Sequence, residues 1–230
     1  MVYGSLVKLF VESCPACGGP SAGGFCAVCA AEFARVPKPC RRCGLALPAA
    51  RCPREQAAWD VDAVVAPFRY GPPLDYYVHA LKYRGSRLIG RALALLLTAE
   101  LDALAGRIDA LVAVPLHRTR LRERGYNQAQ EIARTLAFAL RLPALERGIL
   151  RPAATAAQTG QSAAERRAGI AGAFRVARDL TGVRIAIVDD VVTTGATVNA
   201  LARALRAAGA AHCRAVAVAR TSEPDQTRNV

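Results

Sequence analysis

Two adjacent aspartates, Asp189 and Asp190, are the residues best placed for chemistry, because a short loop rich in small and hydroxyl-bearing residues follows them. The apolar run Ile185 to Val188 precedes them and is typical of a buried strand that would carry both acids to the edge of a sheet. A helix is expected after the loop, and the backbone N–H groups at its N-terminus suit a bound phosphate. Paired carboxylates beside a phosphate can bind ribose hydroxyls and face positive charge that develops at the anomeric carbon.

The loop itself has few large side chains, and glycine lets an anion approach the backbone closely. An ordinary strand-to-helix turn is the alternative, since Asp and Thr favour such positions. The ordered combination of strand, acids, loop and helix favours binding. The candidate phosphate ligands are Thr193, Thr194, Gly195, Ala196 and Thr197.

A duplicated cysteine module near the N-terminus is the second set of residues with chemical potential. Its first copy has the spacing C-x2-C-x8-C-x2-C, and adding 26 to each residue number gives the second copy, which ends in a glutamate. Two residues between thiolates let both sulfurs face one ion, as in structural zinc sites. The predicted ligands are Cys14, Cys17, Cys26 and Cys29 in the first site, and Cys40, Cys43, Cys52 and Glu55 in the second.

Four cysteine ligands close the coordination shell, so the first zinc ion is expected to stabilise a small domain rather than to catalyse. The second site has two interpretations: Glu55 completes a zinc site, or the copy has decayed and its cysteines are small buried residues. Pairing that interleaves the two copies also stays open. Cys213, at the start of the last expected strand, is expected to be a buried small residue.

Composition limits the classes of protein that fit. The 230 residues predict one or two domains, and 53% hydrophobic residues exclude a disordered basic tail. Thirty-one basic against 18 acidic residues give a formal charge of +13, which one zinc ion with four thiolates would lower to roughly +11. This charge favours anionic partners, either phosphorylated metabolites or nucleic acid. No apolar stretch approaches the length of a membrane span, and no secretory leader is evident, so we expect no membrane anchor and a cytoplasmic protein.

The elements that would position these residues alternate between strands and helices after a composition change near residue 60. We therefore expect a zinc-ribbon domain at 1–60 and an α/β domain at 61–230. The alternation predicts a mostly parallel sheet with helices on both faces and ligands at the carboxyl ends of its strands. The expected strands are 63–70, 110–114, one near 149, 183–188 and 215–219, and the expected helices are 75–83, 87–105, 127–140 and 197–208.

Basic residues outside the aspartate segment form two groups. Arg118, Arg120, Arg122 and Arg124 alternate along an expected extended loop, which would place them on one side to bind a pyrophosphate or a nucleic-acid backbone, or simply in solvent. Lys82, Tyr83 and Arg84, with Tyr76 and Tyr77 nearby, combine cations with rings on which unpaired bases could stack. Packing in the core is the alternative for the tyrosines.

The segment from Ile185 to Thr197 resembles the phosphoribosyl pyrophosphate (PRPP) signature of type I phosphoribosyltransferases. Other segments resemble the ComF (competence protein F-like) family, as does the double zinc ribbon, so the likeness covers Cys14 to Arg220. These segments are Lys82 to Gly85, Val114 to Arg118, Arg122 to Gln128, Gln158 to Gly160 and Glu165 to Arg167.

The resemblance implies a type I phosphoribosyltransferase fold that binds Mg²⁺–PRPP and transfers its phosphoribosyl group to a nitrogen acceptor of unknown identity. Asp189, Asp190 and Arg118 would be catalytic, and the loop 193–197 would bind the 5′-phosphate. Leu116, His117 and Arg118 would bind pyrophosphate, and 151–174 would be the flexible catalytic loop. A link to DNA uptake in natural transformation is also implied. The alternatives are a single-stranded DNA-binding protein that works with other competence proteins, and a PRPP-sensing regulator.

Overall fold

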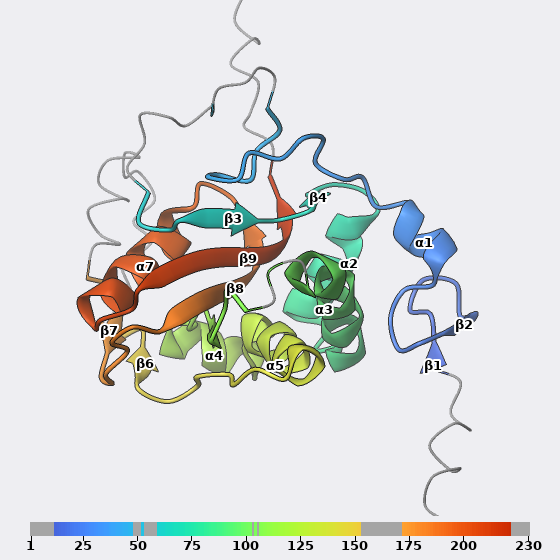
Figure 1. The fold of residues 1–230 in the computed structure, drawn as a ribbon. Helices are drawn as coiled ribbons and strands as arrows, with labels where there is room; N and C mark the ends of the chain where they lie inside the picture. The colour runs from blue at the N-terminus through green and yellow to red at the C-terminus, as the bar shows by residue number, and fades with distance from the viewer. Residues whose placement is uncertain are drawn as a thin grey trace, which may run out of the picture.

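A five-stranded parallel sheet forms the centre of the computed structural model, which describes residues 12–47, 52, 59–102, 104, 106–152 and 172–221 (Figure 1). Its order is β3-β9-β8-β5, with β4 also beside β9, and every pairing is parallel. The prediction of a mostly parallel sheet is therefore confirmed. The strands are β3 (Ala63–Val65), β4 (Phe68–Arg69), β5 (Ala110–Ala113), β8 (Arg184–Val192) and β9 (His212–Arg220).

Helices cover both faces of this sheet, and the central strands alternate accordingly. In β8, Ile185 and Ile187 belong to the core that includes α7 (Ala196–Ala207). Ala186 and Val188 belong to the opposite core, with α2 (Leu74–Tyr83), α3 (Arg87–Asp102) and α5 (Gln128–Leu140). A strand buried on both faces has no polar side, which explains its continuous apolar run. The predicted helices are confirmed with small shifts of their ends.

Residues 118–124 differ from the prediction, because they form the helix α4 (Arg118–Arg124) rather than an extended loop. The His117 side chain caps this helix by accepting a hydrogen bond from the Thr119 amide at 3.2 Å, and Gly125 ends it with φ 75°. Residues four apart share a helix face, so Arg118 and Arg122 lie on a different face from Arg120 and Arg124. The prediction of one continuous positive edge is wrong.

The expected single strand at 63–70 is likewise divided into β3 and β4. The remaining short elements form two antiparallel pairs and one helix. They are β1 (Glu12–Ser13) with β2 (Pro20–Ser21), β6 (Ile149–Leu150) with β7 (Arg175–Val176), and α1 (Ala27–Ala31). Within the described ranges, no helix is long and apolar enough to cross a bilayer.

Residues 33–47, which include the first part of the second cysteine module, pack against the edge of the sheet. The Val36 amide donates to the Pro67 carbonyl at 2.8 Å, and the Val64 amide donates to the Arg41 carbonyl at 2.9 Å. Phe33 is buried in the same core as Phe68. In Figure 1 this blue segment passes over β3 and β4, whereas α1, β1 and β2 lie on the far side of the molecule from α7.

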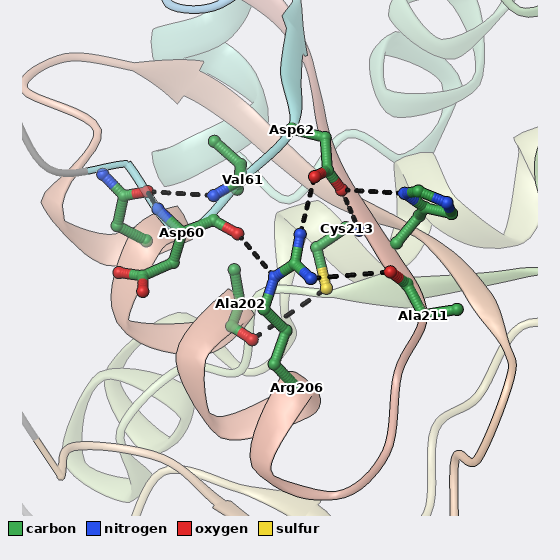
Figure 2. Close-up of polar contacts among 9 residues, drawn as sticks. Asp60, Val61, Asp62, Ala202, Arg206, Ala211 and Cys213 are labelled. Atoms are coloured by element: carbon green, nitrogen blue, oxygen red, sulfur yellow. Dashed lines mark hydrogen bonds and ion pairs between the residues drawn. The ribbon is translucent and has the colours of Figure 1, made fainter.

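A polar cluster holds the segment before β3 against α7 and β9 (Figure 2). Asp62 accepts hydrogen bonds from the Arg206 guanidinium at 2.6 Å and from the Cys213 amide at 2.8 Å, and His212 lies 3.5 Å from it. Arg206 also donates to the Asp60 carbonyl at 2.9 Å. Cys213 is fully buried, which confirms the prediction of a buried small residue. Burial also raises the pKa of its thiol to about 11.

Candidate functional site

The candidate site lies at the carboxyl edge of the sheet, where β5 ends beside the last part of β8. Ala113 pairs with Val188, so the segment after β5 starts next to Asp189 and Asp190. Both acids still belong to β8, which extends to Val192 and therefore beyond the predicted end at residue 188. The fold thus brings together the two segments that sequence analysis assigned to ribose and pyrophosphate.

Asp190 is buried, with 4% of its surface exposed, and it forms an ion pair with Lys82. The Lys82 ammonium, at the C-terminal turn of α2, lies 3.1 Å from Asp190 Oδ2. Lys82 was predicted as a nucleic-acid ligand, but the structure directs its charge onto the acid pair. No pattern in the sequence indicates this contact, because 107 residues lie between Lys82 and Asp190 along the chain.

Asp189 is partly buried at the edge of the sheet, and the pKa of its carboxyl group is raised. Burial, followed by the adjacent negative charge of Asp190, raises the pKa of Asp189 to about 8, although Lys82 opposes the rise. Its Oδ1 accepts a hydrogen bond from the Asp190 amide at 2.9 Å, which fixes the carboxyl orientation. A carboxyl group held protonated near neutral pH is poised to ionise when positive charge arrives.

Gly195 forms the turn from β8 into α7 with φ 81°, a left-handed conformation that favours glycine. The Trp59 indole lies against it, so that a Cβ at residue 195 would stand 2.5 Å from the ring. Thr193 and Thr194 are exposed beside this turn, and Thr194 Oγ1 accepts from the Ala196 amide at 3.3 Å. The predicted phosphate loop is therefore a glycine-dependent turn that ends at a helix N-terminus, with one side covered by Trp59.

Leu116 and His117, from the predicted pyrophosphate segment, are partly exposed, and Arg118 is exposed. Asn127 anchors the start of this segment, since its Nδ2 donates to the Val114 carbonyl at 3.0 Å while its Oδ1 caps α5 through the Ala129 amide at 3.1 Å. A cavity of about 290 Å³ lies beside the segment. Its polar lining includes Arg118, Asn127, Gln130, Glu146 and Arg151.

Seven cysteines gather into two clusters that follow the two modules, so interleaved pairing is wrong. The clusters are Cys14, Cys17, Cys26 and Cys29, and Cys40, Cys43 and Cys52, with the sulfurs of each cluster within 4.8 Å of one another.

Sulfur spacing in both clusters fits a metal ion. The sulfurs of Cys17 and Cys26 are 3.8 Å apart, and those of Cys43 and Cys52 are 3.6 Å apart. Tetrahedral zinc with Zn–S bonds of about 2.3 Å separates its sulfurs by about 3.8 Å, whereas a disulfide bond is about 2.05 Å. Burial opposes ionisation of Cys14, but backbone amides that point at its sulfur lower its pKa to about 6. Glu55, the predicted eighth ligand, lies outside the described residues.

The basic and aromatic residues of α2 form an exposed surface with part of α4. The Arg124 guanidinium lies 5.2 Å from the centre of the Tyr83 ring, and Arg84 donates to the Tyr76 hydroxyl at 3.1 Å. Tyr76 and Tyr83 are 55% and 63% exposed, whereas Tyr77 packs against Phe25. Of the predicted nucleic-acid ligands, the structure thus gathers Tyr83, Arg84 and Arg124. Arg120 and Arg122 are also exposed on α4, Arg120 on the same face as Arg124.

Most of the predicted flexible catalytic loop, residues 153–171, lies outside the described residues, together with the motifs at 158–160 and 165–167. The described start of the loop places the Arg151 guanidinium over the Phe174 ring, 5.3 Å from its centre. Burial lowers the pKa of Arg151, and the Asp189 charge opposes this effect. Arg151 also lines the cavity beside the predicted pyrophosphate segment, so it is a further cation at the candidate site, and no motif in the sequence marks it.

Comparison with known proteins places these observations in a family. The phosphoribosyl transferase domain family matches residues 97–229. DNA utilization protein YhgH of Salmonella typhi is 36% identical over 209 residues, which cover 86% of this chain and 91% of that protein. Competence protein F of Haemophilus influenzae is 31% identical over 220 residues, which cover 89% of this chain and 95% of that protein.

Solved structures give more distant likenesses. Glutamine PRPP amidotransferase from B. subtilis, complexed with ADP and GMP, has a TM-score of 0.43 and 21% identity, over 61% of this chain and 30% of that chain. Purine phosphoribosyltransferase from Pyrococcus horikoshii Ot3 has a TM-score of 0.34 and 19% identity, over 56% of this chain and 80% of that chain. On the matches of sequence above, the chain belongs to the ComF family and contains a phosphoribosyltransferase domain.

Proposed function

We propose that this protein binds Mg²⁺–PRPP at the carboxyl edge of the sheet and transfers its phosphoribosyl group to a nitrogen acceptor, with release of pyrophosphate. The observation that carries the proposal is the acid pair in β8, with Asp190 buried and Asp189 partly buried, shortly before the glycine turn at the start of α7. A zinc-ribbon unit at 1–60 and a catalytic unit at 61–230 complete the proposed organisation.

In this proposal, the amides of residues 193–197 hold the 5′-phosphate, since a helix N-terminus with a glycine turn favours a bound anion. Asp189 and Asp190 face the ribose and stabilise positive charge at the anomeric carbon as its bond to pyrophosphate breaks. Arg118, with Leu116 and His117, lies where the departing pyrophosphate would be held. The nitrogen lone pair of the acceptor then forms the new bond to the same carbon.

Magnesium fits this site because carboxylate oxygens are the ligands it prefers, and Asp189 is a carboxyl group whose ionisation awaits a nearby cation. Asp189 and the PRPP oxygens would hold the ion. When bound, it would neutralise charge on the leaving pyrophosphate.

The phosphate loop is tested by Gly195→Ala, which we expect to weaken the affinity for ribose 5-phosphate by roughly tenfold or more. A side chain there meets both an unfavourable φ of 81° and the Trp59 ring, which together cost at least about 2 kcal/mol. Isothermal titration calorimetry measures the affinity. Gly182→Ala is the matched control, because Gly182 has φ 78° with open space around it, at the opposite end of β8. Equal affinity in the two variants would place the phosphate elsewhere.

Turnover is tested by measuring pyrophosphate release from PRPP with Mg²⁺ across bases and amines offered as acceptors. Release that depends on one acceptor supports the transferase. Binding of PRPP with no release of pyrophosphate in the presence of any of the acceptors would instead support a sensor.

A second candidate function, binding of single-stranded DNA, is favoured by the exposed Tyr83 ring with the Arg124 guanidinium beside it. Bases stack on exposed rings, and cations follow the nucleic-acid backbone. Two relatives of this chain are named for DNA utilization and for competence, and the net charge of +13 favours a polyanion. Tyr83 and Arg124 belong neither to the acid pair nor to the loop 193–197, so DNA binding and PRPP binding are compatible. Other competence proteins are the further partners that this role would imply.

Tyr83→Ala should weaken binding of a single-stranded oligonucleotide by roughly tenfold, because one stacked base contributes about 1–3 kcal/mol. Fluorescence anisotropy at several salt concentrations measures the affinity and the number of phosphate contacts. Phe138→Ala is the control, since Phe138 is an aromatic residue of α5 that is 89% exposed. DNA binding that both variants weaken equally, or that neither changes, would exclude the Tyr83 surface.

A further inference from the structure

Arg220, the last residue of β9, is a buried cation between the second cysteine module and the phosphate loop. Only 1% of the surface of this residue is exposed. Nε donates to the Cys43 carbonyl at 2.9 Å, and Nη1 donates to the Val192 carbonyl at 2.9 Å and to the Thr193 carbonyl. One planar guanidinium therefore joins the turn of the second cysteine module to the last residue of β8 and the first residue of the phosphate loop.

The turn that Arg220 contacts is held by its own cluster of sulfurs. Cys43 is fully buried, and its Sγ lies 3.6 Å from Cys52 Sγ. The Gly44 amide donates to the Cys40 carbonyl at 2.7 Å, and a Cβ on Gly44 would stand 3.5 Å from Arg220 Cδ. The module thus packs directly on the arginine, and the orientation of the Cys43 carbonyl depends on the conformation of the cysteine turn.

Trp59 provides a second contact between the same two regions. Its ring lies against Gly195 of the phosphate loop. The residue also packs with the buried cluster of Cys40, Cys43 and Leu45, and with the core of the sheet that includes α7. Any shift of the second module would therefore reach the loop through packing as well as through hydrogen bonds.

The first cysteine cluster differs in its surroundings. Its turn at Gly24 packs on Leu95 of α3, and its α1 lies away from α7 in Figure 1. The duplicated modules, although alike in sequence, consequently support different parts of the fold.

We propose that Cys40, Cys43 and Cys52 form a metal site whose occupancy positions the phosphate loop, and that Arg220 is the positioning residue that transmits it. This inference rests on the proposed function only in naming a phosphate ester as the ligand of the loop. A buried guanidinium requires its acceptors, since a lost hydrogen bond to a charged group leaves an uncompensated charge in the interior. When the metal leaves, the Cys43 carbonyl is no longer held toward Arg220, and the arginine no longer holds the Val192 and Thr193 carbonyls in one place.

The experiment compares Cys52→Ser with Cys26→Ser, which removes the equivalent ligand of the first module. Native mass spectrometry of the full chain counts zinc ions, hydrogen exchange without ligand reports on amides 193–197, and calorimetry measures the affinity for ribose 5-phosphate. We expect each variant to lose one zinc ion. Only Cys52→Ser should speed exchange of the loop, and it should weaken the affinity by roughly tenfold, the effect of one lost charged hydrogen bond.

Arg220→Lys tests the transmission separately, because one ammonium cannot span the carbonyls that the guanidinium joins. The Arg220→Lys protein should keep both zinc ions, but its amides 193–197 should exchange hydrogen faster than those of the native protein, as in Cys52→Ser. Arg214→Lys is its control, since Arg214 of β9 donates in the same way to the Arg107 carbonyl at 2.7 Å, away from the loop. If Arg220→Lys does not fold, the two serine variants decide the question.

Loss of zinc in Cys52→Ser with loop exchange unchanged would overturn the inference, as would equal loop exchange in Cys52→Ser and Cys26→Ser. No zinc at the second cluster of the native protein would also overturn it. Failure of the proposed function is distinguishable, because the native protein would then not bind ribose 5-phosphate or PRPP while the exchange comparison still tests the coupling.

Discussion

Replacing Asp190 by Asn should lower the rate of pyrophosphate release from PRPP by roughly 100- to 1000-fold, the usual effect of removing one preorganised electrostatic group from an active site. The substitution keeps the shape of the side chain but removes the charge that, in the proposed function, stabilises the anomeric carbon. It also removes the partner of Lys82, whose ammonium lies 3.1 Å from Asp190 Oδ2. A coupled pyrophosphate assay at saturating PRPP measures the effect.

Asp109→Asn is the control for this substitution. Asp109 lies just before β5 and pairs with Arg184 at the start of β8, so it occupies the opposite end of the same two strands. We expect the rate of release to change little in that variant. Full turnover in Asp190→Asn would show that the acid pair does not take part in the reaction.

Replacing Lys82 by Met should lower the free energy of unfolding by about 3 kcal/mol at pH 8, because removing one partner of a buried ion pair leaves an uncompensated charge. The Lys82 side chain is 23% exposed and that of Asp190 is 6% exposed, so water screens the pair weakly. Urea denaturation of the ligand-free protein measures the loss. The double variant with Asp190→Asn should recover most of it, since no charge is then left unpaired. A single variant as stable as the native protein would show that the pair contributes nothing to folding.

The pH dependence follows from Asp189, whose pKa is about 8 in the folded protein against an ordinary value of 3.8. A folded-state pKa above the unfolded one means that the folded state holds the proton more tightly. The stability that this proton provides is complete below about pH 4 and is lost as the pH rises through 8. Lys82 opposes the rise in the pKa of Asp189. Lys82→Met should therefore increase the loss of stability as the pH rises, and Asp189→Asn should decrease it.

The acid pair links the stability of the ligand-free protein to the binding of a cation. Two adjacent carboxyls in β8 are costly in the ligand-free protein, as the raised pKa of Asp189 shows. A ligand that brings a cation would remove that cost. We therefore expect Mg²⁺ with PRPP to raise the thermal stability of the native protein more than that of Asp189→Asn.

Sequence patterns determined the architecture of this chain, since burial on both faces of a parallel sheet demands apolar strands that alternate with helices. The strand and helix positions around β8 and α7 followed from that demand. The spacing of the cysteines likewise predicted metal ligands, because two intervening residues make a turn of the right size, but only the structure showed that each module forms its own cluster. The glycine turn at residue 195 was readable for the same reason, as it depends on neighbours along the chain.

Local patterns failed where two backbone conformations suit the same residues. The alternating arginines at 118–124 fit an extended loop by period, but His117 and Gly125 cap the segment into a helix. Capping residues act on the few unpaired amides and carbonyls at helix ends, and this contribution outweighed the apparent period of two.

Contacts between distant segments were decided only by the tertiary structure. Lys82 meets Asp190, Trp59 covers Gly195, and Arg220 joins Cys43 to the phosphate loop. Each contact pairs residues from different elements, and its geometry depends on how helices and modules dock on the sheet. Docking is set by the summed packing of many side chains, which no short stretch of sequence contains. The amino-acid sequence therefore specified which functional groups reach the edge of the sheet. The tertiary structure determined which distant residues contact those groups.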